Sequence, residues 1–169
     1  MNNELSEGYM NEAALKGIVL NTKLIRTIAL GVFRRDDRIF VVEGYDPNKS
    51  ENFYRPLGGG IEFGERGVEA LAREMREETG LEVENLRYLG MCENIFIYLG
   101  EMGHEIALVY SGDFVDRSVY DRDWVDCKED DETPFRAVWK RLDEFGKDKD
   151  GPLYPDELMG LLSYSGEEK

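Results

Sequence analysis

The segment from Gly59 to Leu81, GGIEFGERGVEALAREMREETGL, constrains the fold of this 169-residue chain more than any other part of the sequence. Residues 65–79 contain no proline, and most are Ala, Leu, Met, Glu or Arg, which favour helix. Gly80 suits a left-handed end to that helix. The segment therefore predicts a helix over roughly Arg66 to Thr79, placed directly after a glycine-rich loop.

The predicted helix has an apolar side and an acidic side. The apolar residues that recur at helical spacing, and should be buried, are Val68, Leu71, Ala72 and Met75. The glutamates that share the other side are Glu74, Glu77 and Glu78. Neighbouring like charges destabilise a helix by about 0.2–0.5 kcal/mol per pair, and Arg73 offsets part of this because it precedes Glu77 by one turn.

Carboxylates crowded in this way are ligands that a hard divalent cation prefers. Mg²⁺ takes oxygen ligands in near-octahedral geometry, typically from carboxylates, water and substrate phosphates. A solvated acidic face is the alternative explanation, because the whole chain is acidic. The fixed offset between the glutamates and the glycine loop favours a metal site, with Mg²⁺ as the expected cofactor and Mn²⁺ as the alternative.

At every defining position, Gly59 to Leu81 resembles the signature box of the Nudix hydrolase family. The resemblance implies an α/β fold, with an α/β/α sandwich around a mixed β-sheet. It also implies hydrolysis of a pyrophosphate linkage in a nucleoside diphosphate joined to another moiety.

The resemblance further implies the roles of individual residues. The implied metal ligands are Glu74, Glu77, Glu78 and the backbone carbonyl of Gly59. Arg73 would orient Glu77 through an ion pair, and Glu65 would brace the loop or contact a second metal. The expected catalytic residues are thus Glu77, Glu78 and Arg73.

The chemistry of pyrophosphate hydrolysis suits such a site, because positioning and charge neutralisation dominate it. A metal ion polarises phosphoryl oxygens and lowers the pKa of a bound water, and a carboxylate can accept the proton of that water. The sequence does not fix which carboxylate is the general base. A nucleotide-sensing binding module and a non-hydrolytic use of the fold are the alternatives, although a sensor would not need the carboxylates.

Composition limits the partners. With 36 acidic and 21 basic residues the net charge is −15, which disfavours binding to a nucleic-acid backbone and leaves a nucleotide-type small molecule as the expected substrate. The sequence shows no signal peptide and no apolar run of about 18 residues, so no membrane association is expected. Cys92 and Cys127 lack metal-type spacing and predict reduced thiols in a cytoplasmic protein. The oligomeric state is left open, with a homodimer among the alternatives.

The remaining sequence predicts one Nudix-type domain over residues 23–169, preceded by a loose arm over residues 1–22. Strands are expected at 24–33, 39–43, 53–57, 83–99 with a kink near Gly90, 104–114 and 135–141. An acidic loop is expected at 116–132, and a C-terminal helix at 155–162.

Polar residues interrupt the apolar strands that follow the box. The candidates for substrate contacts are Glu93, His104 and Glu105, with Asn94 beside them. A buried carboxylate without a partner is costly, so a substrate base or sugar would explain their presence, and so would exposure at a strand end. Tyr98 has a counterpart in family members that act on dinucleoside polyphosphates, although core packing is its default role. The substrate therefore stays open.

Overall fold

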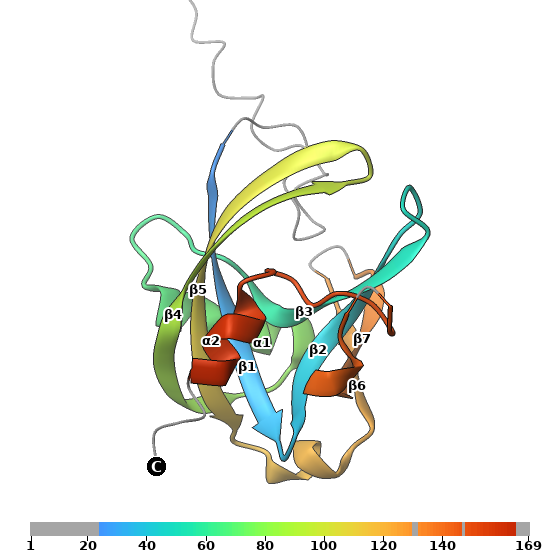
Figure 1. Cartoon of the computed structure of the whole chain (residues 1–169). Coiled ribbons are helices and arrows are strands. Elements are labelled where there is room, and N and C mark those ends of the chain that lie inside the picture. The colour runs from blue at the N-terminus through green and yellow to red at the C-terminus, as the bar shows by residue number, and fades with distance from the viewer. Residues whose placement is uncertain (1–23, 130–131, 147, 165–169) are drawn as a thin grey trace, which may run out of the picture.

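The computed structural model describes residues 24–129, 132–146 and 148–164. Its strands and α-helices follow the order β1 (Arg26–Arg35), β2 (Arg38–Asp46), β3 (Glu51–Gly60), α1 (Gly67–Thr79), β4 (Val83–Tyr98), β5 (Glu101–Phe114), β6 (Trp124–Lys128), β7 (Pro134–Arg141) and α2 (Leu158–Tyr164) (Figure 1). The predicted arm and part of the predicted acidic loop, residues 130–131, lie outside the described residues.

The strands form one mixed seven-stranded sheet in the order β4-β5-β1-β3-β2-β7-β6. β1 pairs in parallel with β5 and antiparallel with β3, so it lies at the centre of the sheet. Residues 28–33 of β1 are all buried, as a strand covered on both faces requires. The first part of β3 pairs with β2 and its last part with β1, so this strand joins the two halves of the sheet.

The two helices cover opposite faces of the sheet, which confirms the α/β/α sandwich. On one face, Leu71 and Met75 of α1 pack in a core with Ala29, Phe33 and Phe114. On the other face, Leu158 and Leu162 of α2 pack in a second core with strand residues that include Ile28, Leu30 and Val32. Figure 1 shows α2 in front of the sheet and α1 behind it. Neither helix in the described part of the chain is long and apolar enough to cross a membrane.

Helix α1 matches its prediction in extent and in its ends. It begins one residue later than expected, and the Glu69 carboxylate accepts a hydrogen bond from the Arg66 N–H at 3.0 Å. At the other end Gly80 adopts φ 69° and donates its N–H to the Arg76 carbonyl at 3.0 Å, as a left-handed cap does.

The predicted buried stripe of α1 was only partly right. Leu71 and Met75 are fully buried, whereas Val68 and Ala72 are half-buried and Ala70 is buried instead. The buried face of the helix therefore includes Ala70 in place of Ala72. The same face also includes Glu78, three residues after Met75.

The predicted acidic loop at 116–132 was wrong. Residues 117–121 form a short 3-10 helix, and β6 pairs antiparallel with β7. Val125 and Cys127 are buried between exposed neighbours, so the segment has the alternation of a strand with one covered face. The aspartates around and within the strand, such as Asp121, Asp123 and Asp126, concealed this alternation.

Other elements differ from their predictions mainly in length. The connection between the strands expected at 83–99 and 104–114 is shorter than predicted, because β4 ends at Tyr98 and β5 already begins at Glu101. The kink near Gly90 is present as a shift in the pairing of β4 with β5 between Tyr88 and Gly90. Helix α2 begins at Leu158, three residues later than the predicted Pro155.

Gly58 lies where β3 passes from one half of the sheet to the other. It adopts φ 132°, a conformation that L side chains rarely adopt, and a Cβ there would lie 2.0 Å from the carbonyl oxygen of Ala29. At Gly60, by contrast, a Cβ would have no atom within 4 Å. Only the first of these glycines is thus required by the backbone.

We expect Gly58→Ala to lower the free energy of unfolding by about 1–3 kcal/mol, because alanine strains this backbone and collides with β1. Gly60→Ala is the matched control and should stay near the wild-type value. Urea unfolding of both variants measures the difference. Equal stability of the two variants would contradict the assigned role of Gly58.

Candidate active site

The glutamates of α1 differ in exposure because they follow different rows of the helix. Glu78 continues the buried row of Leu71 and Met75 and is 9% exposed. The Glu74 side chain is 14% exposed and that of Glu77 is 47% exposed. On the acidic side predicted for α1, exposure therefore increases from the buried Glu78 through Glu74 to Glu77, which faces solvent.

Arg73 joins the helix to the loop before it. Its Nη1 donates to Glu74 Oε1 and to Glu77 Oε2, each at 3.0 Å. Its Nε and Nη2 donate to the two carboxylate oxygens of Glu65 at 3.0 Å, and Nη2 also donates to the Gly60 carbonyl at 2.9 Å. The ion pair expected between Arg73 and Glu77 is present, within a larger network.

Glu65 braces the loop from the other side. Besides its two bonds from Arg73, the Glu65 carboxylate accepts the Glu62 N–H at 3.1 Å. The hydrogen bonds from Arg73 hold the pKa of Glu65 below its ordinary value. Glu65 is therefore a charged acceptor at neutral pH, in the bracing geometry that is one of its two expected roles.

Gly59 leaves room for the carboxylate of Glu74. A Cβ at Gly59 would lie 2.4 Å from the carboxyl carbon of Glu74 and 2.6 Å from each of its oxygens. Any side chain at this position would push Glu74 away. Gly59, which lies near the end of β3 and not in the predicted loop, thus packs directly against a helix carboxylate.

The chemistry of this donor set fits a hard cation. Its side-chain donors are carboxylates and the loop adds backbone carbonyls, and oxygen ligands of this kind suit Mg²⁺. Within residues 24–129, 132–146 and 148–164, no three His, Cys, Asp or Glu side chains are already grouped as a metal site. The Arg73 guanidinium instead bridges Glu74 and Glu77.

A second charged group lies next to the box, at the start of β1. Arg26 Nη1 is 3.9 Å from Glu105 Oε1 on the neighbouring strand, and both atoms are buried without a hydrogen bond. Burial lowers the pKa of Arg26, while the charges of Glu105, Glu74 and Glu78 raise it. Burial raises the pKa of Glu105, which Arg26 partly offsets. Arg26 therefore lies within electrostatic reach of both the box and β5.

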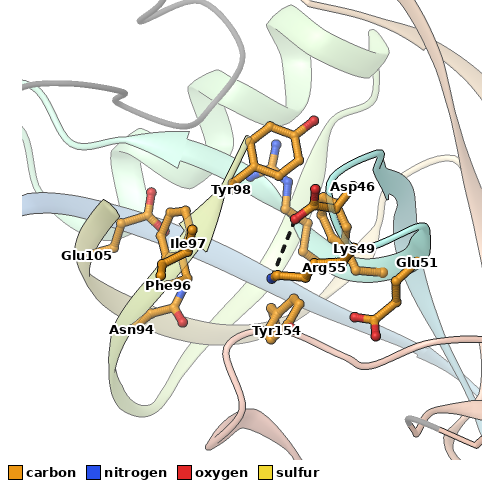
Figure 2. A pocket seen from close by; sticks show the side chains of 11 residues that line it. Asp46, Lys49, Glu51, Arg55, Asn94, Phe96, Ile97, Tyr98, Glu105 and Tyr154 are labelled. Atoms are coloured by element: carbon orange, nitrogen blue, oxygen red, sulfur yellow. Dashed lines mark ion pairs between the residues drawn. The ribbon is translucent and has the colours of Figure 1, made fainter. Parts of the chain in front are cut away.

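A cavity opens beside this pair, between the β2–β3 hairpin and the β4–β5 hairpin. Figure 2 shows Glu105, Asn94, Phe96 and Ile97 of β4 and β5 on one side, facing side chains of β2, β3 and their turn. The complete lining is Asp46, Lys49, Glu51, Phe53, Arg55, Asn94, Phe96, Ile97, Tyr98, Glu105 and Tyr154. The lining thus combines aromatic side chains with five charged ones, of which Asp46, Glu51 and Glu105 are acidic and Lys49 and Arg55 are basic.

Of the predicted substrate residues, Glu105 lines this cavity, and so does the neighbouring Asn94. Glu93 and His104 do not, because adjacent strand residues point to opposite faces. His104 Nε2 lies 3.0 Å from Glu93 Oε1, so these two side chains pair with each other. Tyr98, for which core packing was the default, lines the cavity.

Sequence reasoning missed Arg26 and Arg55. Each had a detectable signal, since Arg26 directly precedes the apolar run of β1 and Arg55 interrupts the apolar segment before the glycines. Tyr154 could not be found in this way, because only the fold returns its loop to the cavity.

Cys92 and Cys127 are unbridged, and burial raises the pKa of their thiols to about 11 and about 12, so neither is poised as a nucleophile.

Comparison with known proteins gives local matches in sequence. The "NAD-capped RNA hydrolase NudC" of Vibrio atlanticus (strain LGP32) is 37% identical over 57 residues, which cover 34% of this chain and 20% of that protein. The "RNA pyrophosphohydrolase" of Pelagibacter ubique (strain HTCC1062) is 29% identical over 79 residues, covering 47% of this chain and 48% of that protein. The chain therefore spans about a fifth to a half of the length of these relatives.

The structural match is broader. The crystal structure of a MutT NUDIX hydrolase from Burkholderia pseudomallei superimposes with a TM-score of 0.58 at 22% identity, covering 83% of this chain and 98% of that one. At this identity the match shows the fold alone. The family model of the NUDIX domain matches residues 23–159, which include the box, the sheet and the cavity, and this chain belongs to the NUDIX domain family.

Proposed function

We propose that this chain is a metal-dependent hydrolase that cleaves a pyrophosphate linkage in a nucleoside diphosphate derivative. The observation that carries the proposal is the network around Arg73, which gathers Glu65, Glu74 and Glu77 behind the glycine loop. The carboxylates concentrate negative charge on one side of a helix, which is unfavourable by itself and would be offset by a bound cation.

Glu74, Glu77, Glu78 and the Gly59 carbonyl are the proposed holders of the cation, Mg²⁺ or alternatively Mn²⁺. When bound, such a cation neutralises charge on phosphoryl oxygens and lowers the pKa of a water ligand. Arg73 positions Glu77 and Glu74, and Glu65 fixes the loop through Arg73. Glu77, the most exposed of the three α1 glutamates, and Glu78 are the candidates for accepting the proton of the attacking water.

The proposed substrate is a small nucleotide. Relatives that match parts of this chain carry names that refer to RNA and NAD-capped RNA, but this chain has a net charge of −15. An extended nucleic-acid backbone normally needs a basic face, whereas a cation can screen a short polyphosphate locally. We place the protein in the cytoplasm. A homodimer is compatible with this proposal but is not required by it.

A panel of nucleotides tests the proposal directly. Phosphate or nucleotide release should be measured with Mg²⁺ against nucleoside triphosphates, oxidised nucleotides, nucleotide sugars, dinucleoside polyphosphates and NAD-capped RNA. Binding without turnover across the panel would instead support a nucleotide sensor, and a rearranged product would support non-hydrolytic use of the fold.

Removal of the cation or of one carboxylate charge should abolish turnover. EDTA is expected to eliminate hydrolysis, and Glu77→Gln or Glu78→Gln should lower kcat by about 100-fold or more, because charge stabilisation at the phosphates is lost. Glu82→Gln is the control, since Glu82 is exposed and pairs with Arg76 outside the network. Far-UV circular dichroism verifies folding. Wild-type turnover in EDTA would refute metal dependence.

Gly59→Ala should separate metal binding from folding. The added methyl group meets the flexible end of Glu74 and not the backbone, so the fold should survive while Mn²⁺ affinity falls by about tenfold or more. Titration of Mn²⁺ by electron paramagnetic resonance measures this loss. Gly60→Ala is the control, and equal affinities of the two variants would contradict the placement of the cation beside Gly59.

Glu105 and His104 should differ in their effects on kinetics. Glu105→Gln removes a charge from the cavity and should raise KM by about tenfold with a smaller change in kcat. His104→Ala should leave both parameters unchanged, because His104 pairs with Glu93 outside the cavity lining. Steady-state kinetics on the best substrate provide the measurement. A larger KM shift in His104→Ala than in Glu105→Gln would place the specificity site on the opposite face of the hairpin.

A further inference from the structure

One face of the β4–β5 hairpin is apolar and exposed. Residues opposite each other in an antiparallel pair share a face, and Ile97 lies opposite Met102 in this hairpin. Both of these side chains are more than half exposed, and so are those of Met91 and Ile95. The apolar residues of this surface, which we call the hairpin face, are Met91, Ile95, Ile97, Met102, Ile106 and Leu108. Single exposed apolar residues are common, but a contiguous set of this kind marks an interaction surface.

The alternation along the hairpin is the reverse of that in an ordinary half-covered strand, whose apolar residues face the core and whose polar residues face solvent. The opposite face of β4 carries the buried Cys92, and Phe96 on that face lines the cavity. The polar residues Glu93 and His104 on the hairpin face pair with each other at 3.0 Å. A segment can therefore cover the hairpin face without leaving these two groups unsatisfied.

At its inner end the hairpin face joins the core beneath α1. Leu108 packs against that core together with Ile61, and a Cβ at Gly67, the first residue of α1, would lie 3.0 Å from Leu108. At its outer end the hairpin face follows β4 and β5 toward the tip of the hairpin, which projects from the sheet (Figure 1). The hairpin face is thus an extension of a core that the described residues leave exposed.

The chain enters the sheet beside the hairpin face. Arg26 opposite Glu105 is the first pair between β1 and β5. Strand β5 itself begins at Glu101, so it extends past the start of β1 toward the hairpin tip. The exposed Leu24 and Ile25, which precede β1, therefore lie next to the outer half of the hairpin.

An apolar run precedes Leu24 by a few residues. Residues 13–20 read AALKGIVL, in which six of the eight side chains are apolar. The four residues from Leu20 to Leu24 span up to about 13 Å when extended, whereas the two strand spacings from β1 to β4 amount to about 10 Å. The run is therefore within reach of the hairpin face. The NUDIX family model matches only from residue 23, so the family does not account for this run.

We infer that residues 13–20 cover the hairpin face of their own chain. A segment tethered so closely acts at an effective concentration of about millimolar, and the net charge of −15 opposes association between two copies. Phe96 and Glu105, on the other face of the same strands, line the cavity, so the bound segment supports this cavity wall from behind. The inference goes beyond the proposed function and does not depend on it.

Trypsin cleavage after Lys16 tests the inference in the full chain, because Lys16 lies within the apolar run. A covered site is cut when the segment detaches, so the rate follows the detached fraction. Ile95→Asp in the hairpin face and Leu20→Asp in the run should each raise the rate by about tenfold or more, since each removes an apolar contact. Val115→Asp is the matched control, because Val115 is an exposed aliphatic residue outside the hairpin face, and its rate should equal that of the wild type.

A double variant distinguishes a direct contact from two separate effects. Ile95→Asp combined with Leu20→Asp should be cut at most about twofold faster than the faster single variant, because either change alone already detaches the segment. Ile95→Thr keeps the β-branched shape that suits a strand and should raise the rate less, in the same direction. Mass spectrometry measures the initial rates, and far-UV circular dichroism verifies folding.

Three results would overturn the inference. Equal cleavage rates in Ile95→Asp and Val115→Asp would show that the hairpin face does not cover Lys16. Multiplied effects of Ile95→Asp and Leu20→Asp in the double variant would assign the two residues to separate contacts. Protection that rises with protein concentration, together with a dimer in light scattering that Ile95→Asp abolishes, would make a second copy of the chain the occupant of the hairpin face.

Discussion

The network of Arg73 is the interaction on which the candidate site depends. One guanidinium donates to Glu65, Glu74, Glu77 and the Gly60 carbonyl, so it links the loop, the first turns of α1 and the acidic side of the helix. Without it the carboxylates would repel one another and the loop would lose its attachment to the helix. Charged hydrogen bonds of this type are about twice as strong as neutral ones.

Under the proposed function, cation binding at this site would be an exchange of partners. Glu74 and Glu77 both accept from Arg73 Nη1, so a cation held by them would compete with a guanidinium and not only with water. The free energy of metal binding would then be a difference between two electrostatic arrangements. The Glu65 contacts use Nε and Nη2, so these contacts do not depend on the partners of Nη1.

Much of the fold and of the box could be predicted from the sequence, because those features depend on local pattern. The extent of α1 follows from its composition and from Gly80, and the pair of Arg73 with Glu77 follows from helical spacing. The register of α1 could not be predicted, since Ala70 and Ala72 are equally apolar and only the sheet decides which is buried. Strand β6 was missed because the acidic residues around it, and Asp126 within it, concealed the alternation of Val125 and Cys127.

The cavity was harder to predict because it depends on contacts between distant segments. Glu105 attracted attention as a carboxylate at the head of an apolar strand, and it lines the cavity. Glu93 and His104 carried the same signal, but the pleat turns them to the other face, where they pair. Arg55 and Tyr154 meet Glu105 only through the crossing of β3 and the return of the C-terminal segment. The residue pattern of a single segment contains no information about contacts between distant segments.

The crossing of β3 has a consequence for how such a protein can change over evolution. Arg55, at the cavity, and Gly59, against Glu74, lie four residues apart on one strand, with Gly58 at φ 132° between them. At about 3.3 Å per residue they are separated by roughly 13 Å of continuous backbone. One wall of the cavity and the glycine that faces the Glu74 carboxylate are thus parts of a single strand. Substitutions in the β4–β5 hairpin and at Tyr154 can therefore reshape the cavity without altering the strand that contacts the carboxylates of the box.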